Sequence, residues 1–132
     1  GEIEALLMYV ERGRSKSSPI SCTFGLWKND AIVPVGKATV MPSSEETVYI
    51  DAFVRDHTAG RFGPVREVAH DRETGLVLEI AFEGLERSSR HKSGISMRAA
   101  RITRIRPERP PSEAAAIGAL ECLLPARQIT RE

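Results

Sequence analysis

The chain has 132 residues, which suffices for one domain with a core of its own. Its content of 41% hydrophobic and 28% charged residues is typical of a soluble globular domain and excludes a disordered chain. The formal net charge is +1, and the sequence has neither a secretory signal peptide nor the run of about 20 apolar residues that spans a bilayer.

The residues that most often form reactive or metal sites are few and scattered. Cys22 and Cys122 lie outside any C-x-x-C spacing, which argues against a disulfide scaffold or zinc site and favours a reducing, cytosolic compartment. His57, His70 and His91 show no metal-binding spacing, so we expect no metal site. No hydrolase or Walker motif occurs, and the first residue, glycine rather than methionine, suggests a piece of a longer protein.

The first part of the chain favours β-strands. Residues 3–10 are apolar and predict a strand, and the polar, basic residues 11–18 predict a loop. Residues 20–27 and 31–40 flank the turn Lys28-Asn29-Asp30 and predict a β-hairpin.

A helix is predicted over residues 44–57. Pro42 ends the preceding strand, and Ser43 with Glu46 has the spacing of a capping box. Its apolar face would consist of Tyr49, Ala52 and Phe53. Gly60 and Gly63-Pro64 then break the helix.

The second half of the chain predicts strands at residues 65–69, 76–82 and 97–105, with a polar loop at 87–96. A last helix would begin after Ser112 and carry an apolar stripe. Alternation in the third of these strands would place Arg98, Arg104 and Arg106 on one face, with Arg101 pointing away or re-aimed by a bulge.

This order of elements predicts a mainly β fold. Three strands, a helix, further strands and a C-terminal helix correspond to a five-stranded OB-fold barrel with a helix between strands 3 and 4. We expect this domain to occupy residues 1–124 and a tail to occupy 125–132. SH3-like barrels and other small α+β folds begin in a similar order, so the order alone leaves them open.

Basic residues are concentrated late in the chain. Residues 85–109 carry eight basic and two acidic residues, a local charge of +6 that leaves −5 for the rest. Seven of the eight are arginines, which suit bidentate contacts with phosphate, so this segment would face a polyanion. Arg12, Arg14 and Lys16 form a smaller basic group. The alternative for both basic groups is that their charges are simply solvated at the surface. Phe24 and Trp27 could stack on bases, and the alternative for them is a place in the core.

The segment 82–111, FEGLERSSRHKSGISMRAARITRIRPERPP, resembles the C-terminal OB-fold domain of ATP-dependent DNA ligases, including nucleotidyltransferase motif VI. The stretches CTFGLW (22–27), VPVGKA (33–38) and RFGPVR (61–66) extend the resemblance in the same order. The chain departs from the family pattern at Ala99-Ala100, where Phe-Pro is usual, and at Pro107-Glu108-Arg109, where x-Asp-Lys is usual.

The resemblance implies a division of labour between domains. A separate adenylation domain would supply the K-x-D-G lysine, which this sequence lacks, and would bind ATP and Mg²⁺; this chain alone would be inactive. The implied motif VI residues, which would orient the ATP pyrophosphate, are Arg104, Arg106, Glu108, Arg109, Arg98 and Arg101. The implied contacts with nicked double-stranded DNA come from Arg12, Arg14, Lys37, Arg87, Arg90, His91 and Lys92.

A ligase of this kind would work in the cytoplasm, associated with the nucleoid, and would have no membrane partner. Three alternatives remain: a non-catalytic OB-fold module that only binds nucleic acid, a related messenger RNA capping enzyme, and a stand-alone enzyme. The absent lysine motif and the altered motif VI favour the first of these, and the R-H-K-S-G-I series favours a ligase over a capping enzyme.

Overall fold

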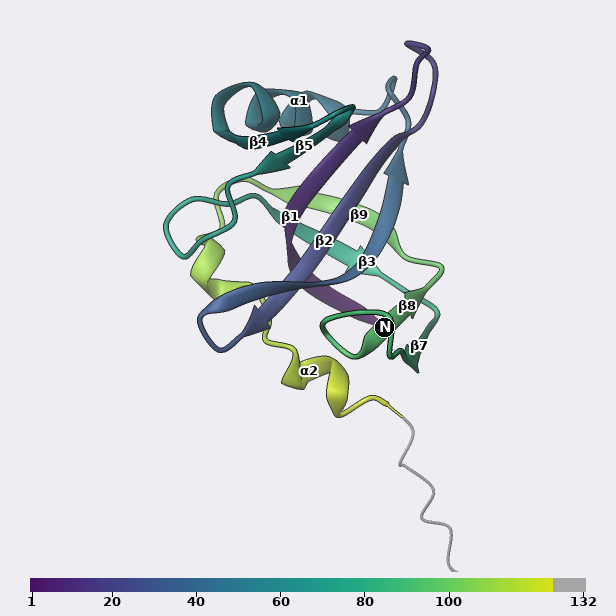
Figure 1. The fold of residues 1–132 in the computed structure, drawn as a ribbon, viewed down its shortest axis with the longest axis vertical. Coiled ribbons are helices and arrows are strands. Elements are labelled where there is room, and N and C mark those ends of the chain that lie inside the picture. Colours follow the sequence, from purple (N-terminus) through teal and green to yellow (C-terminus); the bar gives the residue numbers. More distant parts are fainter. Residues whose placement is uncertain (125–132) are drawn as a thin grey trace, which may run out of the picture.

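The computed structural model describes residues 1–124, and the predicted tail, 125–132, lies outside these residues (Figure 1). None of the helices described there is long and apolar enough to cross a membrane. The elements in chain order are β1 (Glu2–Arg12), β2 (Ile20–Lys28), β3 (Ala31–Val40), α1 (Glu46–His57), β4 (Thr58–Phe62), β5 (Val65–Val68), β6 (Val77–Ala81), β7 (Gly84–Arg87), β8 (Ile95–Arg98), β9 (Arg101–Arg106), a 3-10 turn (Pro111–Glu113) and α2 (Gly118–Glu121).

Strand β1 is the centre of the sheet. It pairs with β2 along one edge, while its other edge pairs first with β6 and then with β5. A register shift between Leu7 and Tyr9 bends the strand where these partners change. The seven-stranded antiparallel sheet is completed by β3 beside β2, β4 beside β5 and β9 beside β6. A separate two-stranded sheet consists of β7 and β8.

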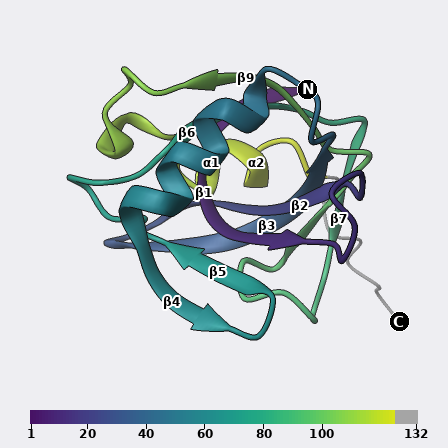
Figure 2. The same ribbon diagram turned by 90° about the horizontal axis from the view of Figure 1, so that it is seen from above.

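This arrangement confirms the mainly β OB-fold with a helix after its third strand. The strands outnumber the five expected because β4–β5 and β7–β8 are added hairpins. The sheet curls until β3 lies against β9, but in the described residues no ladder of hydrogen bonds joins these two strands, so the sheet is not a closed barrel. Phe24, Leu26 and Ile80 are fully buried inside the curl, and Ile50 of α1 covers one end of it (Figure 2).

The helix prediction is correct in place and wrong in detail. Helix α1 starts at Glu46, and its N-cap residue, Glu45, makes no side-chain capping bond, so the Ser43–Glu46 capping box does not form. The Thr47 hydroxyl instead donates to the Met41 carbonyl over 2.8 Å. The face that packs against the sheet carries Ile50 and, as predicted, Phe53, whereas Tyr49 is 48% exposed.

Two glycines after α1 do not act as expected. Gly60 lies within β4, a strand that the sequence analysis missed, and Gly63 turns the chain at a φ of 58° into β5. The sequence of β4 is short, and most of its side chains are exposed, so it carries little hydrophobic signal.

The predicted strand 97–105 is divided into β8 and β9. Ala99 has a φ of 53°, which turns the chain between the two strands. A register shift between Glu79 and Ile80 in the β6–β9 pairing then breaks the alternation of β9. Arg98 therefore lies in a different sheet from Arg104 and Arg106, and the predicted common face of the three arginines does not form.

The C-terminal segment covers the outer face of the sheet as an extended chain. Ser112 lies in the 3-10 turn and caps no long helix; α2 begins only at Gly118. Residues 115–116 are not helical because this stretch bonds to the sheet: Ala115 N–H donates to the Glu4 carbonyl, Trp27 N–H donates to the Ala115 carbonyl, and the Ile117 N–H that follows donates to the Trp27 carbonyl. Those partners are distant in sequence, which is why local patterning predicted a longer helix.

Candidate phosphate and nucleic-acid interface

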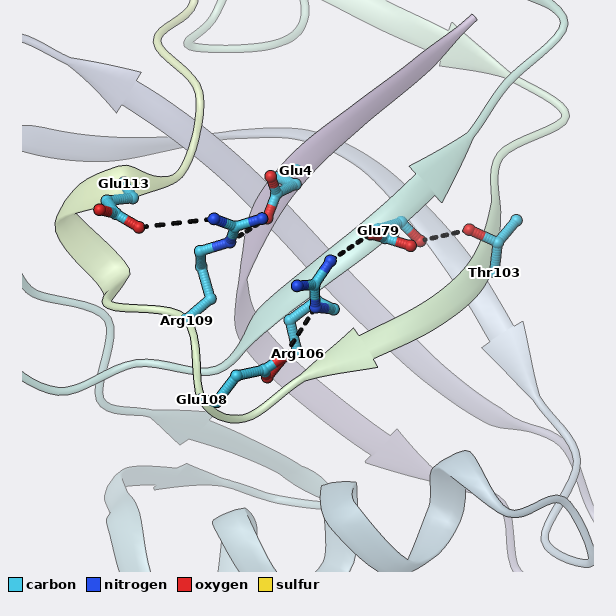
Figure 3. Close-up of polar contacts among 7 residues, drawn as sticks. All are labelled: Glu4, Glu79, Thr103, Arg106, Glu108, Arg109 and Glu113. Atoms are coloured by element: carbon cyan, nitrogen blue, oxygen red, sulfur yellow. Dashed lines mark hydrogen bonds and ion pairs between the residues drawn. The ribbon is translucent and has the colours of Figure 1, made fainter.

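Arg106, at the end of β9, and Arg109, in the turn that follows, each bind two glutamates (Figure 3). Arg106 donates from Nη1 to Glu79 Oε1 over 2.8 Å and from Nε to Glu108 Oε1 over 2.7 Å. Arg109 donates from Nε to Glu4 Oε1 over 2.9 Å, with Glu113 Oε2 3.7 Å from its Nη1. The pairs lie side by side because Arg109 N–H bonds back to the Arg106 carbonyl, closing the turn.

Each of these guanidinium groups keeps a terminal nitrogen for another acceptor. Within residues 1–124 the Nη2 atoms of Arg106 and Arg109 form no hydrogen bond. A guanidinium held by carboxylates at Nε and Nη1 presents its remaining N–H groups in a fixed direction. The arrangement therefore suits a ligand with clustered negative oxygens, such as a phosphate group.

Arg104 and Arg101 differ from this pair because both are exposed and neither has an ion-pair partner in the described part of the chain. Arg104 lines a shallow cavity of about 430 Å³ between β9 and the start of α1, together with Glu108, Thr103 and Tyr49. Arg98, on β8, is 3.6 Å from Glu86 and folds over Gly84. The fold thus gathers four of the six motif VI candidates in one stretch and holds Arg98 apart.

The ion pairing affects the ionisation of Glu108. The hydrogen bond from Arg106 is the main reason that the pKa of this carboxyl lies below its usual value of 4.5. A lowered pKa means that Glu108 stabilises the folded state above pH 4.5, and that this contribution is lost as the pH falls through the lower folded value.

A pH titration of Glu108 tests this pair. We expect its side-chain carboxyl signal in a carbon-detected NMR titration to change at a lower pH than in an unfolded peptide, and Arg106→Gln to move the transition upward. An unchanged titration in Arg106→Gln would show that the bond is absent in solution. Arg55→Gln, which alters an arginine on α1, is the matched control.

A second cluster surrounds the β7–β8 loop. Ser88 Oγ lies 2.6 Å from His91 Nδ1, and Gly94 allows the return of the loop at a φ of 77°. The surface depression at this loop is lined by Lys28, Arg87, Ser88, Ser89, His91, Lys92, Ser93 and Gly94. Arg90 is exposed on the same loop. Hydroxyl groups interleaved with cations on a glycine-containing loop suit the oxygens of a phosphate backbone.

A groove of about 560 Å³ joins that loop to the outer face of the sheet. Lys37 and His91, distant in sequence, line it together with Tyr9, Ser21 and Thr23. Arg12 and Arg14 lie at another end of the sheet, where Arg12 forms an ion pair with Asp51 of α1. The predicted DNA contacts therefore occupy two separate regions. Trp27 and Phe24 are buried, at 5% and 0% exposure, which leaves no ring face for a base.

The sequence analysis missed the acidic partners Glu79, Glu4 and Glu113. Alternation along β6 predicts that the Glu79 side chain lies on the opposite face of the strand from its two neighbours. Only the β6–β9 register, in which Glu79 is paired with Arg104, shows that this side chain lies beside β9. Glu4 lies on β1, more than a hundred residues before Arg109. No local pattern connects such positions.

The sequence of this chain is similar to those of DNA ligases. The chain is 33% identical over 113 residues to a probable DNA ligase of Koribacter versatilis, covering 84% of this chain and 19% of that protein. It is 30% identical over 116 residues to a probable DNA ligase of Opitutus terrae, covering 84% of this chain and 11% of that protein. The chain thus spans a fifth or less of the length of these relatives. No family model matches it.

Two solved structures share the fold. The ligase domain of LigD from M. tuberculosis superposes with a TM-score of 0.61 over 87% of this chain and 38% of that domain, at 16% identity. A mycobacterial DNA ligase D complexed with ATP and MES gives a TM-score of 0.62 over 88% of this chain and 38% of that one, at 14% identity.

Proposed function

Because this chain belongs to the DNA ligase family, to which 84% of its length is related by sequence, we propose that it is the OB-fold domain of an ATP-dependent DNA ligase. Its role would be to close on an adenylation domain during the first chemical step and then to help clamp nicked duplex DNA. The observation that carries this proposal is the row of arginines from Arg104 to Arg109, in which Arg106 and Arg109 are held by carboxylates through Nε and Nη1 and form no hydrogen bond through Nη2 among residues 1–124.

The proposed first step is attack of a lysine, supplied by the adenylation domain, on the α-phosphorus of ATP, which releases pyrophosphate. Negative charge gathers on the leaving oxygens, and positioned arginines stabilise it without reorganising. Arg106 and Arg109 would donate from Nη2, while Arg104, which is free of ion pairs among residues 1–124, would rotate to a neighbouring oxygen. Glu108 would fix Arg106, Arg101 would assist from the start of β9, and Arg98 would assist from the end of β8, across the turn at Ala99.

Magnesium would be held by the adenylation domain, so no step of this chain is routed through the metal. In residues 1–124 no group of three His, Cys, Asp or Glu side chains is suited to hold a metal ion. The residues that we assign to ATP are cationic, which fits contact with its phosphates rather than with the metal. We place the whole protein in the cytoplasm, in association with the nucleoid.

A labelling experiment tests the assignment. The full ligase would be incubated with α-labelled ATP and Mg²⁺, and we expect covalent label that added pyrophosphate removes, followed by sealing of nicked DNA. This chain by itself should acquire no label. Covalent labelling of the isolated chain would contradict the proposed division of labour, and absence of label in the full protein would contradict ligase activity.

A second candidate function is a non-catalytic nucleic-acid-binding module. The observation that favours it is the internal pairing of Arg106 and Arg109, since four carboxylates already offset these two charges inside the domain. Under that function the pairs would serve only to join β1, β6 and the C-terminal segment. DNA binding would persist in variants of both arginines, and no adenylation would be detected in the full protein.

The salt dependence of DNA binding distinguishes a phosphate-tracking surface from a solvated one. If three to five phosphates are contacted, the logarithm of the affinity should fall with that of salt concentration at a slope of roughly −3 to −4. Lys92→Gln should reduce the slope by about 1, the effect of losing one phosphate contact. Lys28 lines the same depression at the β7–β8 loop, so Lys28→Gln should reduce the slope less if that depression holds a single phosphate. Fluorescence anisotropy with nicked duplex measures both, and a flat response would exclude a phosphate contact.

A further inference from the structure

The tip of the β4–β5 hairpin combines an exposed aromatic ring with two arginines. Phe62, the last residue of β4, is 60% exposed. Its ring lies beside Gly60, where an added Cβ would come within 3.2 Å of Phe62 Cε2. Arg61 and Arg66 are directly paired across the two strands. Figure 2 shows the hairpin projecting from the body of the sheet, with β4 at its edge.

Two like charges in direct cross-strand positions destabilise a hairpin unless an opposite charge lies near. In the described residues neither arginine has a carboxylate partner: Arg66 donates to the carbonyls of Gly63, over 2.7 Å, and Val65, and Arg61 has no hydrogen bond. The nearest acidic side chain of β5, Glu67, is engaged by Tyr9 and lies 3.9 Å from His70. The tip therefore keeps its positive charge.

The neighbouring end of β1 adds to this charge. Glu11 of β1 pairs with Val65, so the hairpin turn lies next to Arg12 and the loop that begins after it. Residues 11–18 and 58–67 together contain five basic residues and two acidic ones, Glu11 and Glu67, and the Arg12–Asp51 pair offsets one of the basic residues. The two segments that meet at the exposed ring therefore carry a net positive charge.

We propose that the β4–β5 hairpin tip is a contact site for duplex nucleic acid, with Phe62 against the sugars and base edges of the minor groove and Arg61 and Arg66 on the flanking phosphates. A duplex is favoured as the occupant because it offers phosphates to the two arginines and apolar sugar and base edges to the ring. Minor-groove proteins bind DNA in this way, with apolar side chains flanked by basic residues. Within the ligase the site deepens the proposed DNA clamp, on which it rests. It is separate from the β7–β8 loop and from the Lys37 groove.

The test is binding of the 132-residue chain to a labelled nicked duplex, measured by anisotropy at several salt concentrations. Phe62→Ala should weaken binding about 5–10-fold and leave the salt slope unchanged, because the contact of the ring is apolar. The double variant Arg61→Gln/Arg66→Gln should reduce the slope by about 1.8, corresponding to two phosphates. Leu123→Ala, which removes another 60% exposed apolar side chain, and Arg55→Gln are the matched controls and should have no effect.

The outcomes separate this site from the proposed function. If the wild-type chain binds duplex and Lys92→Gln weakens it while the hairpin variants bind normally, the hairpin proposal alone is overturned. If the wild-type chain binds no duplex, the proposed DNA clamp is overturned together with the hairpin site. If Phe62→Ala instead abolishes self-association of the chain in sedimentation velocity, the ring contacts a second copy, and the nucleic-acid proposal is wrong.

Discussion

Replacement of Arg106 by alanine should reduce self-adenylation of the full ligase about 100-fold or more. The guanidinium lies between Glu79 and Glu108, only 21% exposed, with Nη2 left for a phosphate oxygen. Loss of one preorganised donor to a developing negative charge typically lowers the rate by a factor of about 10²–10³. Single-turnover labelling with α-labelled ATP measures this rate directly.

Substitution of the acidic partner separates a charge role from a positioning role. Glu79→Gln keeps a hydrogen-bond acceptor for Arg106 Nη1 but removes the charge, so we expect a loss of about 10-fold or less, smaller than that of Arg106→Ala. Arg55→Ala, on α1, is the control with normal adenylation. Normal adenylation in Arg106→Ala would show that the Arg106 pairs are structural and would favour the non-catalytic module.

Truncation of Trp27 should be the most destabilising single change in this domain. We expect Trp27→Ala to lower the free energy of unfolding by about 3–5 kcal/mol. The ring is 5% exposed and packs with Leu6, Met8 and Val77, and Arg72 lies over it at 4.3 Å. Because small domains are stable by about 5–15 kcal/mol, this loss would remove a large part of the free energy of unfolding of the domain.

The hydrogen bond of Trp27 makes a second, smaller prediction. Trp27 Nε1 donates to the Pro111 carbonyl over 3.0 Å, holding the C-terminal segment on the sheet. Trp27→Phe keeps much of the apolar contact but removes this bond, and the Pro111 carbonyl then accepts only from Ala114 N–H, so we expect a cost of about 0.5–1.5 kcal/mol. Urea unfolding followed by circular dichroism gives both values, and Phe62→Ala should change stability by less than about 0.5 kcal/mol because its ring is exposed. A loss below about 1 kcal/mol in Trp27→Ala would show that the C-terminal segment is not held through this ring.

Strong local signals predicted most of the elements. The β2–β3 hairpin follows from two β-favouring runs around Lys28-Asn29-Asp30, and Asn29 takes the positive φ, 58°, that such a turn requires. The place of helix α1 follows from Pro42, which ends the preceding strand, and from the acidic residue Glu46 in its first turn. Its apolar face was predicted correctly at Phe53 and wrongly at Tyr49, because only packing shows that Ile50 meets the sheet.

The errors share one physical cause, which is that long-range hydrogen bonds override local preference. Residues 115–116 are not helical because Glu4 and Trp27 form the backbone hydrogen bonds of this stretch, and β4 forms because β5 pairs with it. The break at Ala99 depends on two different partners, β7 for the chain before it and β6 for the chain after it.

The sequence by itself determined the OB-fold, the order of its main elements, the ligase family and the arginine-rich segment, because residue type, turn chemistry and motif spacing are local properties. Only the tertiary structure decided which arginines lie together. The β6–β9 register and the approach of β1 gave Arg106 and Arg109 their carboxylate partners, while the turn at Ala99 removed Arg98 from the row. Ion pairs between residues as distant as Glu4 and Arg109 arise from chain topology, which no local pattern encodes.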